Sequence, residues 1–194
     1  MSYFEYQAIY IGIIVGLAIS NILISIHKLV EAGARVKWHW MAPATALYAA
    51  TVTLAYFWVV WASQGQVGHR TFLTSLPFSI ALGLLFLTCA ASLPDDVPEK
   101  GLDLKQYYFA NRRRLWGFSA CAHVLNLMSW GMNLMGLGFS AAAIQHSLLP
   151  LAGNSGEAAI SVSLMFVRAP WWHAIAFAAL CAWVLFYFGP LVLH

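Results

Sequence analysis

The sequence predicts an all-α protein, a polytopic transmembrane helical bundle with six transmembrane helices, or five if one short segment does not cross. Of its 194 residues, 61% are hydrophobic and only 9% are charged, whereas a soluble domain carries about a quarter of its residues as charged side chains. The few Lys and Arg residues lie mainly in short connections between long uncharged runs. Lipid is therefore expected to surround most of the surface of one domain, residues 1–194.

The long uncharged runs set the expected spans, because a bilayer core needs roughly 20 apolar residues in a helix. The shortest expected span is the segment 155–169. It begins after Asn154, which resembles a capping box with Glu157 three residues on, and it ends before Pro170. About fifteen residues reach only about 22 Å, so this segment either crosses as a short helix or lies at the interface. The expected spans are 6–27, 41–62, 71–93, 115–139, 155–169 and 171–191.

Positive charge sets the expected orientation. Basic residues are concentrated in the connections 28–40 and 94–114, and the positive-inside rule places both in the cytoplasm, with the N-terminus outside. If the segment 155–169 crosses, Arg168 falls on the same side, which favours six spans. The run 102–114 mixes apolar and basic residues and predicts an amphipathic helix on the cytoplasmic surface. We expect an integral protein of a bacterial inner membrane.

The same amphipathic segment supplies the expected partners. Its basic residues are typical of contact with anionic lipid headgroups, and a cytosolic partner or an anionic ligand is the alternative. Nucleic acid is not expected, because the basic residues do not form a continuous stripe. The candidate docking residues are Lys105, Arg112, Arg113 and Arg114.

Small residues recur along one face of the first span. Ala8, Gly12, Gly16 and Ser20 follow each other at four-residue spacing, and Asn21 lies close to that face. Such a face lets another backbone approach closely. It predicts helix packing, either against another helix of the same chain or across a subunit interface of a homo-oligomer or a larger membrane complex.

A polar stripe is expected on the fourth span, where Ser119, Asn126, Ser129 and Asn133 lie near one face. These residues either hold helices together or line a water-filled pathway. The longer spans carry no charged residue near their centres, which argues against an ion-coupled transporter built on a buried carboxylate.

Three histidines are candidate ligands for a cofactor. His27, His123 and His173 all fall toward the cytoplasmic leaflet on this topology, and two facing imidazoles could ligate haem. No HxxxH or HxxEH spacing fixes a pair on one helix, so hydrogen-bonded histidines without a ligand are the alternative. The three cysteines have no zinc-site spacing, and neither a catalytic motif nor a metal-binding motif is present.

These patterns favour a non-enzymatic membrane protein that works through helix-helix contacts, as an accessory subunit of a larger membrane complex or as a homo-oligomer. The first alternative is a small oligomeric channel lined by Asn126 and Asn133. The second is a b-type haem or quinone-linked redox protein that uses His27, His123 or His173.

Overall fold

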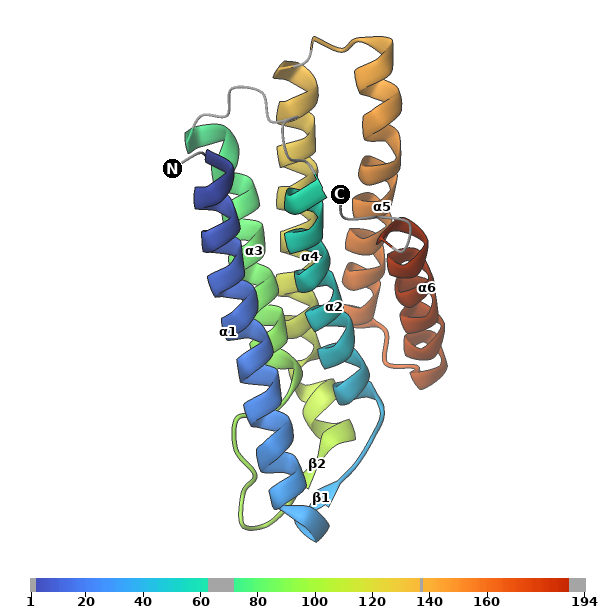
Figure 1. The fold of residues 1–194 in the computed structure, drawn as a ribbon. Coiled ribbons are helices and arrows are strands. Elements are labelled where there is room, and N and C mark those ends of the chain that lie inside the picture. The colour runs from blue at the N-terminus through green and yellow to red at the C-terminus, as the bar shows by residue number, and fades with distance from the viewer. Residues whose placement is uncertain (1–2, 63–71, 137, 189–194) are drawn as a thin grey trace.

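The computed structural model describes residues 3–62, 72–136 and 138–188 and is an all-α bundle (Figure 1). The expected spans also include residues 71, 137 and 189–191, which lie outside this described part. The described residues form six α-helices, a short 3-10 turn (Gly33–Arg35) and two short strands, β1 (Val36–Lys37) and β2 (Leu102–Asp103). The helices are α1 (Tyr3–Glu31), α2 (Met41–Ala62), α3 (Phe72–Ser92), α4 (Leu104–Gly136), α5 (Ala141–Phe166) and α6 (Pro170–Phe188).

Three of these helices are long and apolar enough to cross a membrane, which indicates an integral membrane protein. The spans are Gln7–Glu31 in α1, Ser75–Ser92 in α3 and Pro170–Tyr187 in α6. Only 28%, 39% and 28% of their most apolar windows is buried inside the bundle. Apolar helix surface that faces outward on this scale needs lipid as its solvent.

The prediction of six spans is wrong, because α2, α4 and α5 do not meet the same criterion within the described residues. The reason is clearest in α4 and α5. After its three arginines, α4 still contains His123 and Asn126, and α5 contains Asn154 and Glu157. These side chains lower the mean hydropathy of the two helices, although they point into the bundle.

The segment 102–114 does not form a separate surface helix, since α4 runs without a break for 33 residues from Leu104. Asp103 starts this helix by accepting hydrogen bonds from the backbone N–H groups of Lys105 and Gln106, at 2.9 and 3.1 Å. These bonds satisfy amides that have no partner inside the helix. They also lower the pKa of the Asp103 carboxyl, with the Gln106 amide as the largest cause.

The expected helix start at Asn154 is also wrong. Ser140 is the N-cap of α5, because its side chain accepts from the backbone N–H of Ala143, and the helix then runs for 26 residues through Pro150. The Asn154 side chain donates instead to the Pro150 carbonyl oxygen at 2.8 Å. The segment expected to be a short fifth span is therefore the second half of a long helix.

The two basic connections meet at one end of the bundle (Figure 1). β1 pairs in parallel with β2, which joins Val36 to Leu102 and Lys37 to Asp103. Gly101 allows this approach, because it has a φ of +87° and a Cβ there would lie 2.8 Å from the Arg35 carbonyl oxygen. The connection between α5 and α6 points toward the same end, and α5 lies along α4. The N-terminal end of α1 lies at the opposite end.

Candidate functional site

Polar side chains line the inner face of α4. Arg112, Trp116, Ser119, His123 and Asn126 recur every three or four residues, so they form one stripe along the helix. The first four are buried, and Asn126 is half-buried. Because α4 packs mainly against α3 and α5, a matching set of partners has to come from a neighbouring helix.

α5 supplies that matching set. Asn154, Glu157 and Ser161 have the same spacing and are all buried. Ser119 and Ser161 face each other with their Oγ atoms 3.1 Å apart. Farther along, Asn126 donates from Nδ2 to Oδ1 of Asn154 at 2.8 Å. The two stripes therefore meet along the contact between α4 and α5.

The centre of this contact is a group that we call the Glu157 cluster: Tyr48, His123, Asn126, Asn154 and Glu157. Oε2 of Glu157 lies 3.4 Å from Nδ1 of His123, and the Tyr48 hydroxyl donates to Oε1 of Glu157 at 3.4 Å. The same hydroxyl lies 3.4 Å from Nε2 of His123. One phenol therefore touches both partners of an acid–imidazole pair.

Burial makes this pair unusual. His123 has no exposed surface and Glu157 is 7% exposed. A lone charge is costly to hold in such a place, so the favoured states of the pair are those with no net charge. There are two such states: a neutral acid beside a neutral imidazole, and a carboxylate beside an imidazolium. Both states hold the same number of protons and differ only in the position of one, which can move between Glu157 and His123. Release of that proton to the solvent leaves the pair with one negative charge.

A second group, the His173 cluster, lies farther toward the basic end and consists of Tyr108, Trp116 and His173. The Trp116 Nε1–H donates to the Tyr108 hydroxyl at 2.9 Å, and that oxygen lies 2.7 Å from Nδ1 of His173. Nε2 of His173 lies 3.0 Å from the Val167 carbonyl oxygen. Since a carbonyl can only accept, Nε2 carries the proton and Nδ1 accepts from Tyr108.

The structure does not bring the three candidate histidines together. His27 is exposed and lies 3.9 Å from the Glu31 carboxylate on its own helix, while His123 and His173 belong to the two separate clusters. Both nitrogens of His123 and of His173 face protein partners. Within the described residues, no group of three or more His, Cys, Asp or Glu side chains could hold a metal.

The predicted polar stripe divides into two parts. Ser119 and Asn126 face α5 and bond to Ser161 and Asn154. Ser129 is buried and its Oγ has no hydrogen-bond partner among the described residues, and Asn133 is half-buried. The stripe is therefore a helix contact at its centre.

The small-residue face of α1 points away from the bundle. Gly12, Gly16 and Ser20 are exposed, Ala8 and Asn21 are half-buried, and no described atom lies within 4 Å of a Cβ placed at either glycine. α1 packs through the opposite face, with Ile11, Val15, Ala18, Ile22 and Leu29 buried. Packing of the glycine face against another helix of the same chain is not seen in the described part of the molecule.

The four basic residues predicted to dock a partner differ in their exposure. Lys105, Arg113 and Arg114 are exposed, whereas Arg112 is only 5% exposed. Nη1 of Arg112 donates to the Phe109 carbonyl oxygen at 2.7 Å, and its Nε has no partner within the described residues. Burial, with the neighbouring Arg168, lowers the pKa of Arg112.

Several residues of the site were not predicted from the sequence. Tyr48, Tyr108, Asn154, Glu157 and Ser161 were not among the candidate site residues, and Glu157 was expected in the first turn of a helix. One available signal was the spacing of Asn154, Glu157 and Ser161, which places three polar residues on one face of an otherwise apolar helix.

Comparison of the chain with protein-family models, with curated proteins and with solved structures finds no match. What the protein does is therefore inferred from its own side chains.

Proposed function

We propose that this chain is a multi-pass membrane protein that binds and exchanges a proton at the Glu157–His123 pair. The observation that carries this proposal is the burial of an acid and an imidazole at 3.4 Å, both in contact with the Tyr48 hydroxyl. Ionisable residues inside a membrane bundle are costly and generally serve function. This proposal replaces the expectation that no interior carboxylate is available for proton chemistry.

The contacts among Tyr48, His123 and Glu157 favour exchange of a proton. A hydroxyl can donate to one partner while it accepts from another, so Tyr48 can relay a proton between Nε2 of His123 and Oε1 of Glu157. All three contacts are 3.4 Å long, which is longer than the usual range for a hydrogen bond. Long contacts stabilise each proton position weakly, so neither position is strongly trapped.

A polar route toward the basic end supports the same proposal. The Ser119–Ser161 hydroxyl pair lies on the stripe between His123 and Trp116, and the Trp116 ring is 6.0 Å from the Tyr48 ring. The His173 cluster, whose hydrogen bonds hold each proton in one position, lies beyond this route toward the basic end. In the proposed orientation, which rests on the basic connections, this end faces the cytoplasm.

Infrared difference spectroscopy on protein in lipid vesicles tests proton binding at Glu157. We expect the band of a protonated carboxylic acid to change between about pH 5 and pH 9, and Glu157→Gln to remove that change. Glu99→Gln is the matched control, because Glu99 is exposed in a connection and loses the same charge. A spectrum identical in wild type and Glu157→Gln contradicts the proposal.

A second measurement separates binding from transfer. Vesicles that carry a pH-sensitive dye report proton flux after a pH jump. Faster flux in the wild type and in Glu99→Gln than in Glu157→Gln supports conduction through the site. If proton flux is equal in the wild type and both variants while the infrared change of Glu157 is present in the wild type, the function is restricted to proton binding.

Association through α1 is a second candidate function, favoured by the outward position of Gly12, Gly16 and Ser20. Such a face suits close approach of a helix from a second copy or from a complex partner. Gly16→Ile should abolish a dimer in native mass spectrometry, whereas Leu17→Ile, a change beside it at an exposed position, should not. A monomeric wild type with no copurifying subunit rules this function out.

A further inference from the structure

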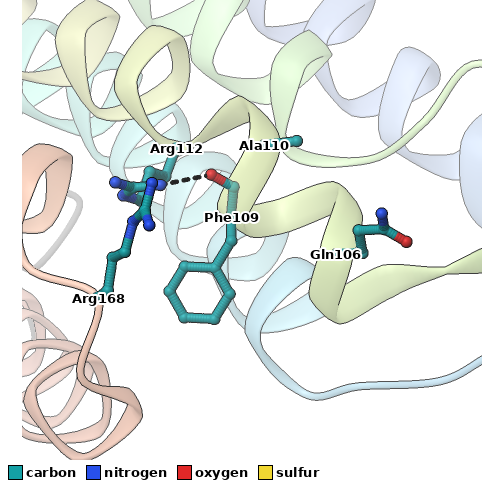
Figure 2. A pocket seen from close by; sticks show the side chains of 5 residues that line it. All are labelled: Gln106, Phe109, Ala110, Arg112 and Arg168. Atoms are coloured by element: carbon teal, nitrogen blue, oxygen red, sulfur yellow. Dashed lines mark hydrogen bonds between the residues drawn. The ribbon is translucent and has the colours of Figure 1, made fainter.

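A pocket of about 430 Å³ lies near the basic end of the bundle, lined by Gln106, Phe109, Ala110, Arg112 and Arg168 (Figure 2). Arg112 comes from α4, and Arg168 comes from the connection between α5 and α6. Figure 2 shows the two arginine side chains converging from these elements beside Phe109. The pocket therefore joins two parts of the chain that are far apart in sequence.

The positive charges of the two arginines in this pocket are not balanced by a nearby carboxylate in the part of the chain that the structure describes. Within the described residues, neither Arg112 nor Arg168 has a carboxylate within ion-pair distance. Arg112 is only 5% exposed, and its Nε has no hydrogen-bond partner among the residues that the structure describes. A buried guanidinium beside a second one is costly, and an anion that bridges the two relieves both the repulsion and the missing hydrogen bond.

The position of the pocket indicates where that anion comes from. Arg168 lies two residues before Pro170, where the apolar span of α6 begins. The exposed rings of Phe166 and Trp171 lie on either side of Arg168 in the chain, as aromatic side chains do at a membrane interface. A group held by Arg168 therefore lies at the level of the lipid headgroups.

We propose that Arg112 and Arg168 bind the phosphodiester group of an anionic phospholipid from the adjacent leaflet. Guanidinium groups match phosphate oxygens in geometry and charge. Phe109 supplies an apolar wall, with its ring 6.0 Å from the Arg112 guanidinium carbon. The bound lipid would link the start of α4 to the connection between α5 and α6. This site is distinct from the Glu157–His123 pair and does not depend on proton exchange there.

Native mass spectrometry with defined lipids tests the site. The probes are phosphatidylglycerol, phosphatidylcholine and inorganic phosphate, each added to delipidated protein in neutral detergent. We expect phosphatidylglycerol to bind and to raise the melting temperature. Phosphatidylcholine should bind at least about tenfold more weakly, because its headgroup has no net charge. Inorganic phosphate as effective as phosphatidylglycerol would overturn the lipid as the source, and equal binding of both lipids would overturn recognition of an anion.

The variant to compare is Arg168→Gln, because Arg168 is exposed and its loss leaves the core intact. It should weaken phosphatidylglycerol binding about tenfold, as loss of a charged hydrogen bond does. Arg114→Gln is the matched control, an exposed arginine on α4 that does not line the pocket. It should stay within about twofold of the wild type. Equal losses in the two variants, or no loss in Arg168→Gln, would overturn the proposal.

Discussion

The two buried histidines in the described part of the chain differ in how firmly their hydrogen bonds hold them. His173 has one partner at 2.7 Å and another at 3.0 Å, and these partners define which nitrogen carries the proton. His123 is equally buried, yet its contacts with Tyr48, Asn154 and Glu157 are all 3.4 Å long. The short hydrogen bonds fix His173 in one protonation state, whereas the long contacts of His123 favour no single state.

The difference follows from the partners. A carbonyl can only accept and an indole N–H can only donate, so every proton in the His173 cluster has one position. In the Glu157 cluster, a carboxyl group, an imidazole and a phenol can each donate or accept. Burial alone therefore does not make a histidine functional; in our proposal it is the carboxyl partner that gives His123 a proton to exchange.

Tyr108→Phe should cause the largest loss of stability, because it removes the central hydroxyl of the His173 cluster. It removes one oxygen and leaves both the Trp116 N–H and Nδ1 of His173 without a partner in a buried place. Each unsatisfied group costs about 1–3 kcal/mol, so we expect the two to lower the free energy of unfolding by about 2–6 kcal/mol. This loss can be measured by unfolding the protein with denaturant in detergent while monitoring tryptophan fluorescence. A loss below about 1 kcal/mol would show that this cluster is not fixed.

Tyr48→Phe is the matched change in the Glu157 cluster and should cost under about 1 kcal/mol, because both contacts of its hydroxyl are long. Its effect should appear in the protonation of Glu157, since the bridging hydroxyl is lost. The infrared change assigned to Glu157 should move along the pH axis in this variant and stay in place in Tyr108→Phe. The reverse pattern would exchange the roles of the two clusters.

The sequence predicts part of this fold well. Absence of charge identified the helices of α1, α3 and α6, because the lipid-facing surface of a span tolerates almost no charge. It was wrong about the limits of α4 and α5, and it also predicted that α2, α4 and α5 cross the membrane. Long uncharged runs do not reveal uncharged polar residues that point into the bundle and lower the mean hydropathy of a helix.

The site was harder to predict for the same reason. Asn154 with Glu157 has the spacing of a capping box, and only the real helix start at Ser140 shows that both lie in a helix interior. Ser119 and Asn126 were identified, because they recur on one face. Tyr48 could not be identified, since it comes from another helix and nothing near it in sequence indicates contact with His123.

Asp103→Ala should have the smallest effect and should act on one cluster only. Asp103 caps α4, and Tyr108 of the His173 cluster lies close to that helix start. The folded pKa of Asp103 is lowered, so the cap contributes stability above the unfolded pKa and loses it in the acid range, as pH falls through the folded pKa. Protection factors from hydrogen exchange at residues 104–108 should fall with acid in the wild type and be low at every pH in Asp103→Ala. Asp103→Asn keeps an accepting oxygen, so its protection should not depend on pH in this range.

Protection around His123 should stay constant in all three proteins, because that cluster is about five helical turns away. A parallel loss there would mean that the two clusters open together and that the looseness of His123 is not a local property.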